Sequence, residues 1–480
     1  MKKMILILLF PILLFGQYGH SGSGVIILSD TTSASEAGLI YTYSGNYYAG
    51  NSSGTYDIIP NPPTGGKVDG YGVIWNNSTE RWQFANVTTS NDWYGVSWDI
   101  KTDTYTRLGN LADSAASATI PDANLPIQSA LRRCVLNNAG NIEYYLKSTN
   151  SNLKANDQPA NIDTTGGLAD GQVVVEIPTF YYYHHYADSV HTWKISQDEL
   201  PGYTKFSKSY VGAYPAAIYD LSAGVYKGDD ADIANTVNDT LCSISGIKPH
   251  TNETRAEYRT LAENRGTGWH LLDNRTLQAI QILYLVEYAN LNIQSEISEG
   301  NTKFTAWDYD ADIGPTGKSN SDGNFSGGQS TTNGDSLDYM SYRGIEDIFG
   351  NIWQFVDGVN INNDGSSSKL YLCSVDSNYA DDISTNYTLY GNLCEVDGYQ
   401  TNFMDISNGF YPTSIGGSSS TYVCDYYYTA YDSDPSGGWR VYLLGGAANS
   451  GGAEGVFCVF ADFGSSYSGS AAGARLCFTP

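Results

Sequence analysis

The sequence predicts an α+β fold for the main part of the chain, with a small all-β module in front of it. Two observations lead to this prediction. Short apolar runs bounded by Gly, Asn and Ser recur along the 480 residues, as in strand-rich proteins. Two segments, 253–264 and 273–291, are predicted as helices, and two helices inserted among many short strands are typical of an α+β domain.

The chain begins with a predicted secretory signal peptide at 1–17. Two lysines precede an apolar run from Met4 to Phe15, which is too short to span a membrane comfortably. Cleavage is expected near Gly16 or Gln17, and an uncleaved hydrophobic anchor is the alternative. The protein is therefore expected to be exported to the extracellular space or cell surface.

Residues 18–101 are predicted to form the all-β module. A polar turn at 76–80 separates Ile74-Trp75 from Trp82-Gln83-Phe84, which is the pattern of a hairpin. Residues 102–125 are poor in large apolar side chains and rich in Ala, Ser, Asp and Thr, so they are predicted as a linker. The second domain is expected to occupy 126–480.

Within that domain, Val173 to Ile177 is the most buried-looking strand. Asp273 can cap a helix that runs to Leu291, and the broad apolar stripe of this helix predicts that it is mostly buried. The helix at 253–264 should end before Gly266, and its Arg/Glu spacing suggests a solvated face.

The composition favours a loop-rich extracellular or virion protein: the chain has 39 Tyr, 51 Gly and only 16% charged residues. Its formal net charge of -26 and the absence of a Lys/Arg cluster argue against a nucleic-acid partner. None of the seven cysteines forms a CxxC pair, so a zinc ribbon is not supported. Cys458 and Cys477 could form a disulfide or remain buried thiols.

Two loops carry oxygen ligands at alternate positions, as calcium loops do. In the second loop Tyr371 stands where a bidentate Glu would be needed, and an Asx-rich turn that needs no ion is the alternative for both loops. No other cofactor is expected. The weak calcium candidates are Asp308, Asp310, Asp312, Asn360, Asn362 and Asp364.

The last part of the chain, 437–480, is expected to form three strands separated by glycine turns and a loop of small, polar and aromatic residues. The loop residues have no apolar period, so they are poor core candidates. A rigid frame that carries such a loop is the arrangement expected of a binding site.

The segment Asp347–Phe355, DIFGNIWQF, resembles the "GN-aliphatic-W-E/Q-W/F" signature of the C-type-lectin-like fold. This fold is shared by formylglycine-generating sulfatase-modifying enzymes and by the variable proteins of diversity-generating retroelements, including phage tropism determinants. The ending of the chain resembles the second branch, since Gly445-Gly446, Gly455-Val456-Phe457, the Ser-rich stretch at 465–470 and Gly473–Leu476 are similar to its "GG…G-x-F…S…GARL" frame. The resemblance covers about residues 126 to 480.

By this resemblance, the residues between the frame positions are diversified and exposed as a ligand-binding face. Their types fit those reachable when the adenines of Asn codons change. The implied ligand-binding residues are Tyr442, Ala447, Asn449, Ser450, Phe460, Asp462, Phe463, Ser465, Tyr467 and Ser470. The implied scaffold of the site comprises Gly350, Asn351, Trp353, Gly445, Gly446, Gly455, Gly473 and Arg475.

The resemblance implies a non-enzymatic receptor-binding protein or adhesin with no catalytic residues. It would act at a cell surface or on a phage virion, and bind a host or neighbouring-cell protein or glycan. Weak single sites would favour a homotrimer or an array. The alternatives are a formylglycine-generating-type oxidase and a structural fibre or surface protein without a dedicated ligand.

Overall fold

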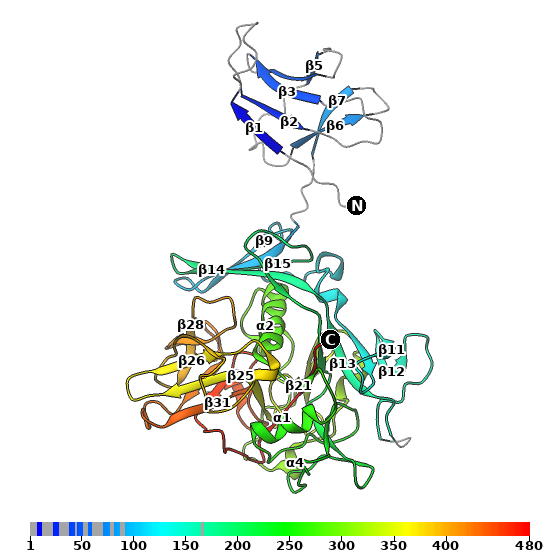
Figure 1. Ribbon diagram of the computed structural model, residues 1–480, viewed down its shortest axis with the longest axis vertical. Helices are drawn as coiled ribbons and strands as arrows, with labels where there is room; N and C mark the ends of the chain where they lie inside the picture. Colours follow the sequence, from blue (N-terminus) through cyan, green and yellow to red (C-terminus); the bar gives the residue numbers. More distant parts are fainter. Residues whose placement is uncertain are drawn as a thin grey trace. The chain divides into compact units, whose positions relative to one another are not determined.

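The computed structural model describes residues 92–164 and 168–480 in full, and seven strands of the segment before them (Figure 1). The chain forms two compact units, Met1–Ser90 and Asn91–Pro480. The first unit contains an antiparallel sheet in the order β1-β2-β3-β4-β5 and a separate hairpin. The sheet strands are β1 (Ile7–Pro11), β2 (Ser23–Ile27), β3 (Gly38–Tyr43), β4 (Asn46–Gly50) and β5 (Tyr56–Ile59).

The hairpin predicted around residues 76–80 is confirmed. Strands β6 (Tyr71–Asn76) and β7 (Arg81–Asn86) pair antiparallel, and Trp75 lies opposite Trp82. Of the predicted signal peptide, 1–17, the structure describes only β1. The predicted cleavage point lies outside the described residues.

The boundary between the units lies earlier than the sequence suggested. Strands β8 (Tyr94–Asp99) and β9 (Thr104–Gly109), which fall in the predicted module and linker, belong to the second unit. They complete a five-stranded sheet in the order β16-β14-β15-β8-β9. The remaining strands of this sheet are β14 (Phe180–Ala187), β15 (Val190–Ser196) and β16 (Thr204–Phe206).

A buried arginine explains why the predicted linker is ordered. Arg107 in β9 donates hydrogen bonds to the carbonyl oxygens of Val286 and Glu287, at 3.1 and 3.0 Å, in the last turn of α2. Its Nε also donates to the carbonyl of Ala115. A cation at a helix C-terminus satisfies carbonyls that have no partner within the helix. This contact therefore holds a segment with few large apolar residues in place.

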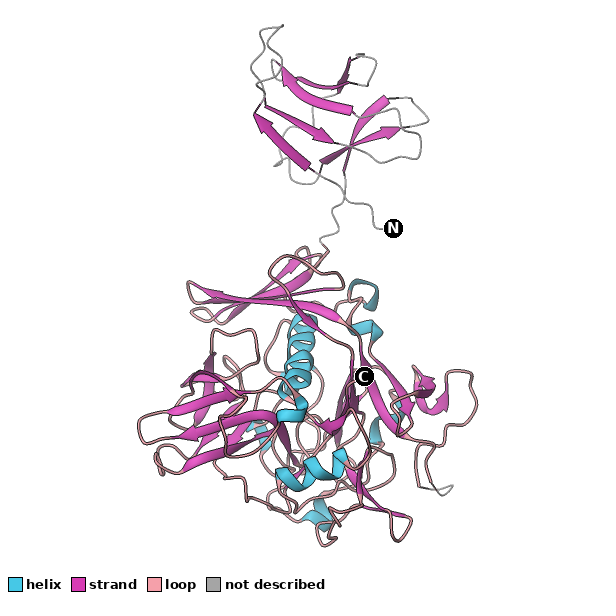
Figure 2. Cartoon of the chain, in the orientation of Figure 1, coloured by secondary structure: helices cyan, strands magenta, loops and turns pink. Residues whose placement is uncertain are grey.

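The prediction of an α+β fold is wrong: strands make up 35% of the structure and helices 12%, which is a mainly-β fold (Figure 2). A seven-stranded sheet has the order β12-β11-β10-β13-β17-β34-β21. Its strands are β10 (Arg132–Leu136), β11 (Ile142–Lys147), β12 (Asn150–Lys154), β13 (Gln172–Ile177), β17 (Ser209–Gly212), β21 (Trp269–Leu271) and β34 (Leu476–Phe478). Every residue of β13 is buried, as predicted for Val173–Ile177.

A nine-stranded sheet, called here the C-terminal sheet, has the order β27-β26-β25-β31-β32-β30-β28-β29, with β33 paired to β25. Its strands are β25 (Trp353–Asn363), β26 (Ser368–Leu372), β27 (Thr388–Asn392), β28 (Gly398–Phe403), β29 (Pro412–Ile415), β30 (Tyr426–Thr429), β31 (Gly438–Leu444), β32 (Val459–Ala461) and β33 (Ala472–Gly473). Two three-stranded sheets are formed by β18 (Ala217–Asp220), β19 (Val225–Lys227) and β20 (Thr240–Cys242), and by β22 (Gly327–Gln329), β23 (Tyr339–Tyr342) and β24 (Ile345–Glu346).

Both predicted helices are confirmed. Helix α2 (Asn274–Tyr288) is capped by Asp273, whose carboxylate accepts the backbone N–H of Thr276 at 2.7 Å, and it is almost wholly buried. Helix α1 (Arg255–Glu263) begins with a capping box between Thr254 and Glu257. The short helices are α3 (Ile293–Glu296) and α4 (Tyr309–Asp312), with 3-10 turns at Asp122–Asn124, Gln128–Ala130, Lys318–Ser321, Asp376–Asn378 and Gly451–Ala453.

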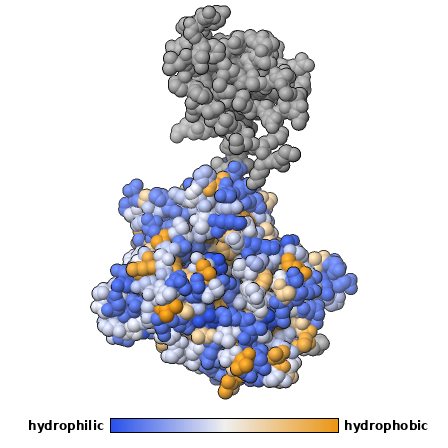
Figure 3. Space-filling model, in the orientation of Figure 1, coloured by the Kyte–Doolittle hydropathy of each residue, from blue (hydrophilic) through white to orange (hydrophobic). Residues whose placement is uncertain are grey.

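Helix α2 lies at the centre of the second unit (Figure 1). Its side chains share one core with residues of β8, β13 and the C-terminal sheet. No helix among the described residues is long and apolar enough to cross a membrane. The face seen in Figure 3 is largely hydrophilic, with scattered apolar patches.

Candidate binding surface

The two motifs that define the family resemblance meet in the core. Arg475 lies between β33 in the C-terminal sheet and β34 in the seven-stranded sheet, so it stands where the chain crosses from one sheet to the other. The guanidinium is fully buried and its Nε donates to Oε1 of Gln354 at 2.8 Å. Its remaining hydrogen bonds go to the carbonyl oxygens of Gly212, Glu346 and Asp347. Arg475 thus ties both sheets to the DIFGNIWQF segment.

Two glycines of the frame make room for buried carboxyl groups. A Cβ on Gly446, which has φ +96°, would lie 2.2 Å from Cδ of Glu454. A Cβ on Gly455 would lie 2.2 Å from a carboxylate oxygen of Asp425. Burial raises the pKa of both acids well above the usual range, which favours their neutral, protonated form. The backbone N–H of Phe457 donates to Asp425 at 2.8 Å.

One face of the C-terminal sheet buries Phe355, Val441 and Leu443 in a second core. Beside this core the same face carries a continuous row of partly exposed rings, called here the aromatic strip, four of which pack against the core. Ring centroids are 5.1 Å apart between Tyr399 and Tyr426, and 4.5 Å apart between Tyr426 and Tyr428. Phe460 lies 5.1 Å from Tyr428. The strip consists of Trp353, Tyr399, Tyr426, Tyr428, Phe460, Phe463 and Tyr467.

Strand alternation places these rings on one face. In β30, Tyr426 and Tyr428 are partly exposed, whereas Tyr427 between them is fully buried. Tyr428 pairs with Phe460 of β32, so both side chains project to the same side. The chain then returns over this face, where the ring of Tyr467 stacks on Phe463 with centroids 3.7 Å apart.

The tyrosines of the aromatic strip offer unused hydrogen-bonding groups. Within the described part of the chain, the hydroxyls of Tyr399, Tyr426, Tyr428 and Tyr467 make no hydrogen bond, and none of them is among the buried unpaired atoms. A phenol can both donate and accept. The strip therefore combines apolar ring area with free polar groups, the combination that is enriched at binding surfaces.

Three predicted ligand-binding residues, Phe460, Phe463 and Tyr467, lie in the aromatic strip. Two others are corrected, because Tyr442 and Ala447 are 1% and 2% exposed and cannot reach an external ligand. Tyr442 faces the opposite side of the sheet, where its ring contacts Tyr411 edge-on at 6.1 Å.

The other five predicted ligand-binding residues lie outside the strip. Asn449 is exposed, and the partly buried Ser450 accepts the backbone N–H of Ala447. Ser465 donates to the carboxylate of Asp382, and Ser470 is the acceptor for the indole N–H of Trp307. Burial, together with the carboxylates of Asp397 and Asp432, raises the pKa of Asp462 to about 6.

Sequence reasoning missed Tyr399, Tyr426 and Tyr428, and assigned Trp353 to the scaffold alone. The run Asp425–Thr429 does carry a signal, because consecutive tyrosines in a strand must point to opposite faces. Which face is exposed depends on the partner strands, and the run alone does not contain that information.

Two calcium candidates of the first predicted loop, Asp308 and Asp312, make local hydrogen bonds. Asp308 caps α4 by accepting the N–H of Ala311, and Asp312 accepts the N–H of Asp308. Asp310 instead lies with Asp229 and Asp230, with oxygens of the three carboxylates within 4.8 Å of one another.

In the second predicted loop, Asn360 and Asn362 belong to strand β25. Asn360 accepts from Arg255 at 2.6 Å. Asp364, in the turn to β26, pairs with Lys369. The alternation of this loop therefore reflects a strand and its hairpin turn.

All seven cysteines are unpaired. Cys477 lies in β34 of the seven-stranded sheet, and Cys458 directly precedes β32 of the C-terminal sheet, so the two thiols considered for a disulfide belong to different parts of the core. Both are fully buried, and burial raises the pKa of each thiol well above its ordinary value. Both are therefore thiols, not reactive thiolates, at neutral pH.

Comparison with known proteins adds no relative against which this surface can be read. No protein-family model matches the chain, and a search of curated proteins finds no match. The aromatic strip and the chemistry of its side chains are therefore the features that indicate a function.

Proposed function

We propose that this protein is a non-enzymatic recognition protein that binds a ligand on a host or neighbouring cell through the aromatic strip. The observation that carries this proposal is the continuity of the strip. Seven partly exposed rings from β25, β28, β30, β32 and the segment after β32 follow one another across a single face. A contiguous row of partly exposed rings with free polar tips is the kind of surface that a partner can cover.

The chemistry of the strip resembles that of antibody paratopes. Tyr and Trp provide large contact area with little loss of side-chain entropy, and their polar tips adapt to different partners. The sheet beneath is held by Arg475 and by the two buried acids, so the rings start from fixed positions. A preorganised surface loses less entropy on binding than a flexible one.

The proposal includes an exported location, at the cell surface or on a phage virion. The apolar run from Met4 to Phe15 and the Tyr- and Gly-rich composition support it. With a net charge of -26, nucleic acid is a poor partner. Several copies, in a homotrimer or an array, would raise the avidity of a weak single site.

The likeness to variable proteins of diversity-generating retroelements adds that the segment 437–480 is diversified. A near-copy of the codons for 440–478 beside the gene, differing mainly at adenines and accompanied by a reverse transcriptase, is the expected finding. Without such a copy the diversification hypothesis is wrong. Binding by the aromatic strip is tested separately, by the cell-binding experiment that follows.

The test compares Tyr428→Ala and Phe460→Ala with Phe325→Ala, which removes a ring that is 45% exposed outside the strip. The fluorescently labelled protein is added to candidate host or neighbouring cells, and bound protein is measured by flow cytometry. We expect each strip variant to reduce binding at least tenfold, since central aromatic residues contribute about 2 kcal/mol or more to an interface. The Phe325 variant should bind like the wild type.

Treating the cells with protease or with periodate separates a protein ligand from a glycan. Equal binding by all three variants and the wild type would contradict the proposal. That result would leave a structural fibre or surface protein, and oxidation of a cysteine-containing peptide in the presence of copper would instead favour the formylglycine-generating-type oxidase.

A further inference from the structure

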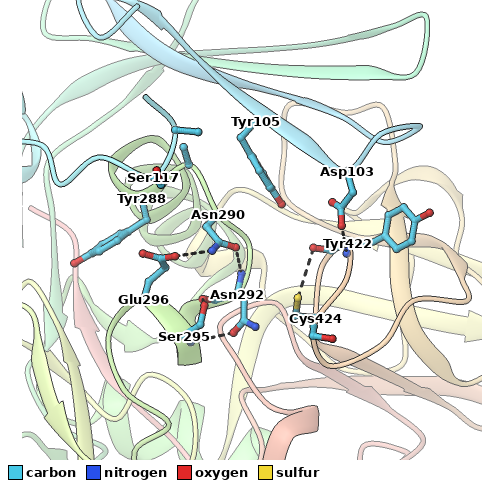
Figure 4. A pocket seen from close by; sticks show the side chains of 13 residues that line it. Asp103, Tyr105, Ser117, Tyr288, Asn290, Asn292, Ser295, Glu296, Tyr422 and Cys424 are labelled. Atoms are coloured by element: carbon cyan, nitrogen blue, oxygen red, sulfur yellow. Dashed lines mark hydrogen bonds between the residues drawn. The ribbon is translucent and has the colours of Figure 1, made fainter. Parts of the chain in front are cut away.

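A cavity that is separate from the aromatic strip opens beside the C-terminal end of α2. Its volume is about 380 Å³. Four segments form its walls: β9 with the turn before it, the loop after β9, the end of α2 through α3, and the loop before β30 (Figure 4). The lining residues are Asp103, Tyr105, Ala116, Ser117, Tyr288, Ala289, Asn290, Asn292, Ser295, Glu296, Ser420, Tyr422 and Cys424.

The Tyr105 hydroxyl is buried at this cavity and donates to no group among the described residues. The ring of Tyr105 stacks on Trp98 with centroids 6.2 Å apart, and it projects from β9 with the hydroxyl toward the space between Asn290 and Cys424 (Figure 4). Burial and the nearby Asp103 carboxylate raise the pKa of Tyr105 well above its ordinary value, so the phenol stays neutral. The backbone N–H of Leu291 lies close enough to lower this pKa in part, so what the hydroxyl has free is its proton. An unsatisfied buried hydroxyl costs about 1–3 kcal/mol, which a ligand oxygen would recover.

The walls of the cavity are held in place by hydrogen bonds that leave the Tyr105 hydroxyl free. Asp103 accepts the indole N–H of Trp98 at 2.9 Å and the backbone N–H of Tyr422 at 2.7 Å, so it fastens the loop before β30 to β9. On the other side, the Asn290 side chain donates to Glu296 and accepts the N–H of Asn292. The site is therefore largely formed before a ligand arrives.

The lining selects against negative charge. It contains two carboxylates, four hydroxyl-bearing side chains besides Tyr288 and Tyr422, whose hydroxyls point away from it (Figure 4), and two amides, but no Lys, Arg or His. Phosphate or carboxylate groups would meet repulsion here and no cation. Hydroxyl groups, which both donate and accept, match such a lining, and aromatic rings can cover the apolar side of a small ring-shaped ligand.

We propose that this cavity binds a neutral or amine-bearing monosaccharide-sized polyol, with the Tyr105 hydroxyl donating to one ligand oxygen. Small-ligand sites usually occupy about 300–1,000 Å³, so the cavity is large enough for one sugar ring. The exposed carboxylate of Glu296 at the rim adds a preference for an amino group. This site is independent of the strip and of the function proposed for it.

The test uses the full chain with D-glucose, D-galactose, D-mannose, D-glucosamine and D-glucuronate, each at about 20 mM, where even a weak ligand raises the melting temperature. Isothermal titration calorimetry measures the affinities. We expect glucosamine and at least one neutral hexose to bind, and glucuronate not to bind. Tyr105→Phe should keep or raise the melting temperature without sugar and weaken sugar binding about tenfold or more.

Two further variants separate the explanations. Glu296→Gln should remove the preference for glucosamine over glucose while leaving glucose binding unchanged. Phe460→Ala, in the aromatic strip, should bind the sugars like the wild type, so failure of one proposal does not affect the other. The proposal is overturned if no sugar binds, if glucuronate binds as well as glucosamine, or if Tyr105→Phe binds like the wild type.

Discussion

The two faces of the C-terminal sheet use the same residue types for opposite purposes. On the inner face Tyr427 and Tyr442 are fully buried in the core that contains α2. On the other face Tyr428 and Phe460 remain partly exposed in the aromatic strip, beside the second core against which Phe460 packs. Tyr427 and Tyr428 are sequence neighbours, so the difference comes from strand alternation and from what covers each face. Aromatic content alone therefore does not distinguish a core from a binding surface.

The largest effect is expected from breaking the frame beneath both faces. Arg475→Met removes a buried guanidinium. Its acceptors then lose their hydrogen-bond donor; they are the side-chain oxygen of Gln354 and the carbonyl oxygens of Gly212, Glu346 and Asp347. We expect the free energy of unfolding to fall by about 5 kcal/mol or more, as measured by urea denaturation.

Arg132→Met is the matched control for this change. The Arg132 side chain is 48% exposed and pairs with Glu176 at 3.7 Å, so its loss should cost less than about 1 kcal/mol. Similar losses for the two variants would show that Arg475 does not hold the sheets together.

The neighbouring tyrosines give the most direct comparison of the two faces. Tyr427→Ala opens a cavity in the core and should lower the free energy of unfolding by about 3–4 kcal/mol. Tyr428→Ala should lower it by about 1 kcal/mol but should reduce cell binding at least tenfold. Urea denaturation and the flow-cytometry assay check the two expectations. The comparison fails if the Tyr428 variant proves as unstable as the Tyr427 variant.

A buried histidine pair on the inner side predicts acid sensitivity. His184 lies 2.9 Å from His191, which contacts Asn402 of β28 at 2.7 Å. Burial, followed by the charge of His191, lowers the pKa of His184 to about 3. The unfolded chain protonates His184 below about pH 6.5, while the folded chain does not. The contribution of His184 to the free energy of unfolding is therefore fully present above pH 6.5 and is lost as the pH falls toward 3.

We expect His184 to account for up to about 3 kcal/mol of the stability lost between pH 7 and pH 4. Denaturation curves at both pH values check this for the wild type and for His184→Phe, which keeps a ring in the stack with Trp193. An unchanged difference between the two pH values in the variant would assign the acid sensitivity to other groups.

The smallest effect is expected at Asp462, which directly follows β32. Its pKa is raised to about 6, so the folded state holds the proton more tightly than the unfolded chain does. The resulting stabilisation is present below pH 4 and is lost as the pH rises through 6. Asp462→Asn should therefore raise the melting temperature at pH 8 and leave it nearly unchanged at pH 4. An equal shift at both pH values would exclude this carboxylate as the cause.

The local patterns that proved correct are those with strong short-range causes. Asp273 starts α2, Val173–Ile177 forms a fully buried strand, and the polar turn at 76–80 closes a hairpin. The fold class was misjudged because two helices give clearer sequence signals than many short strands. The linker was misjudged because one buried cation, Arg107, orders a segment that lacks a large apolar stripe.

The sequence by itself determined that the two helices exist and that Asp273 caps the second, the glycine positions of the closing frame and the aromatic content of its last segment, because capping, backbone freedom and side-chain type are local properties. Only the tertiary structure decided that Arg475 joins two sheets, that Tyr442 and Ala447 are buried, and that Tyr399, Tyr426 and Tyr428 extend the row of rings begun by Phe460. The physical reason is that exposure of a strand residue depends on the register and on the covering of its sheet, and distant parts of the chain set both.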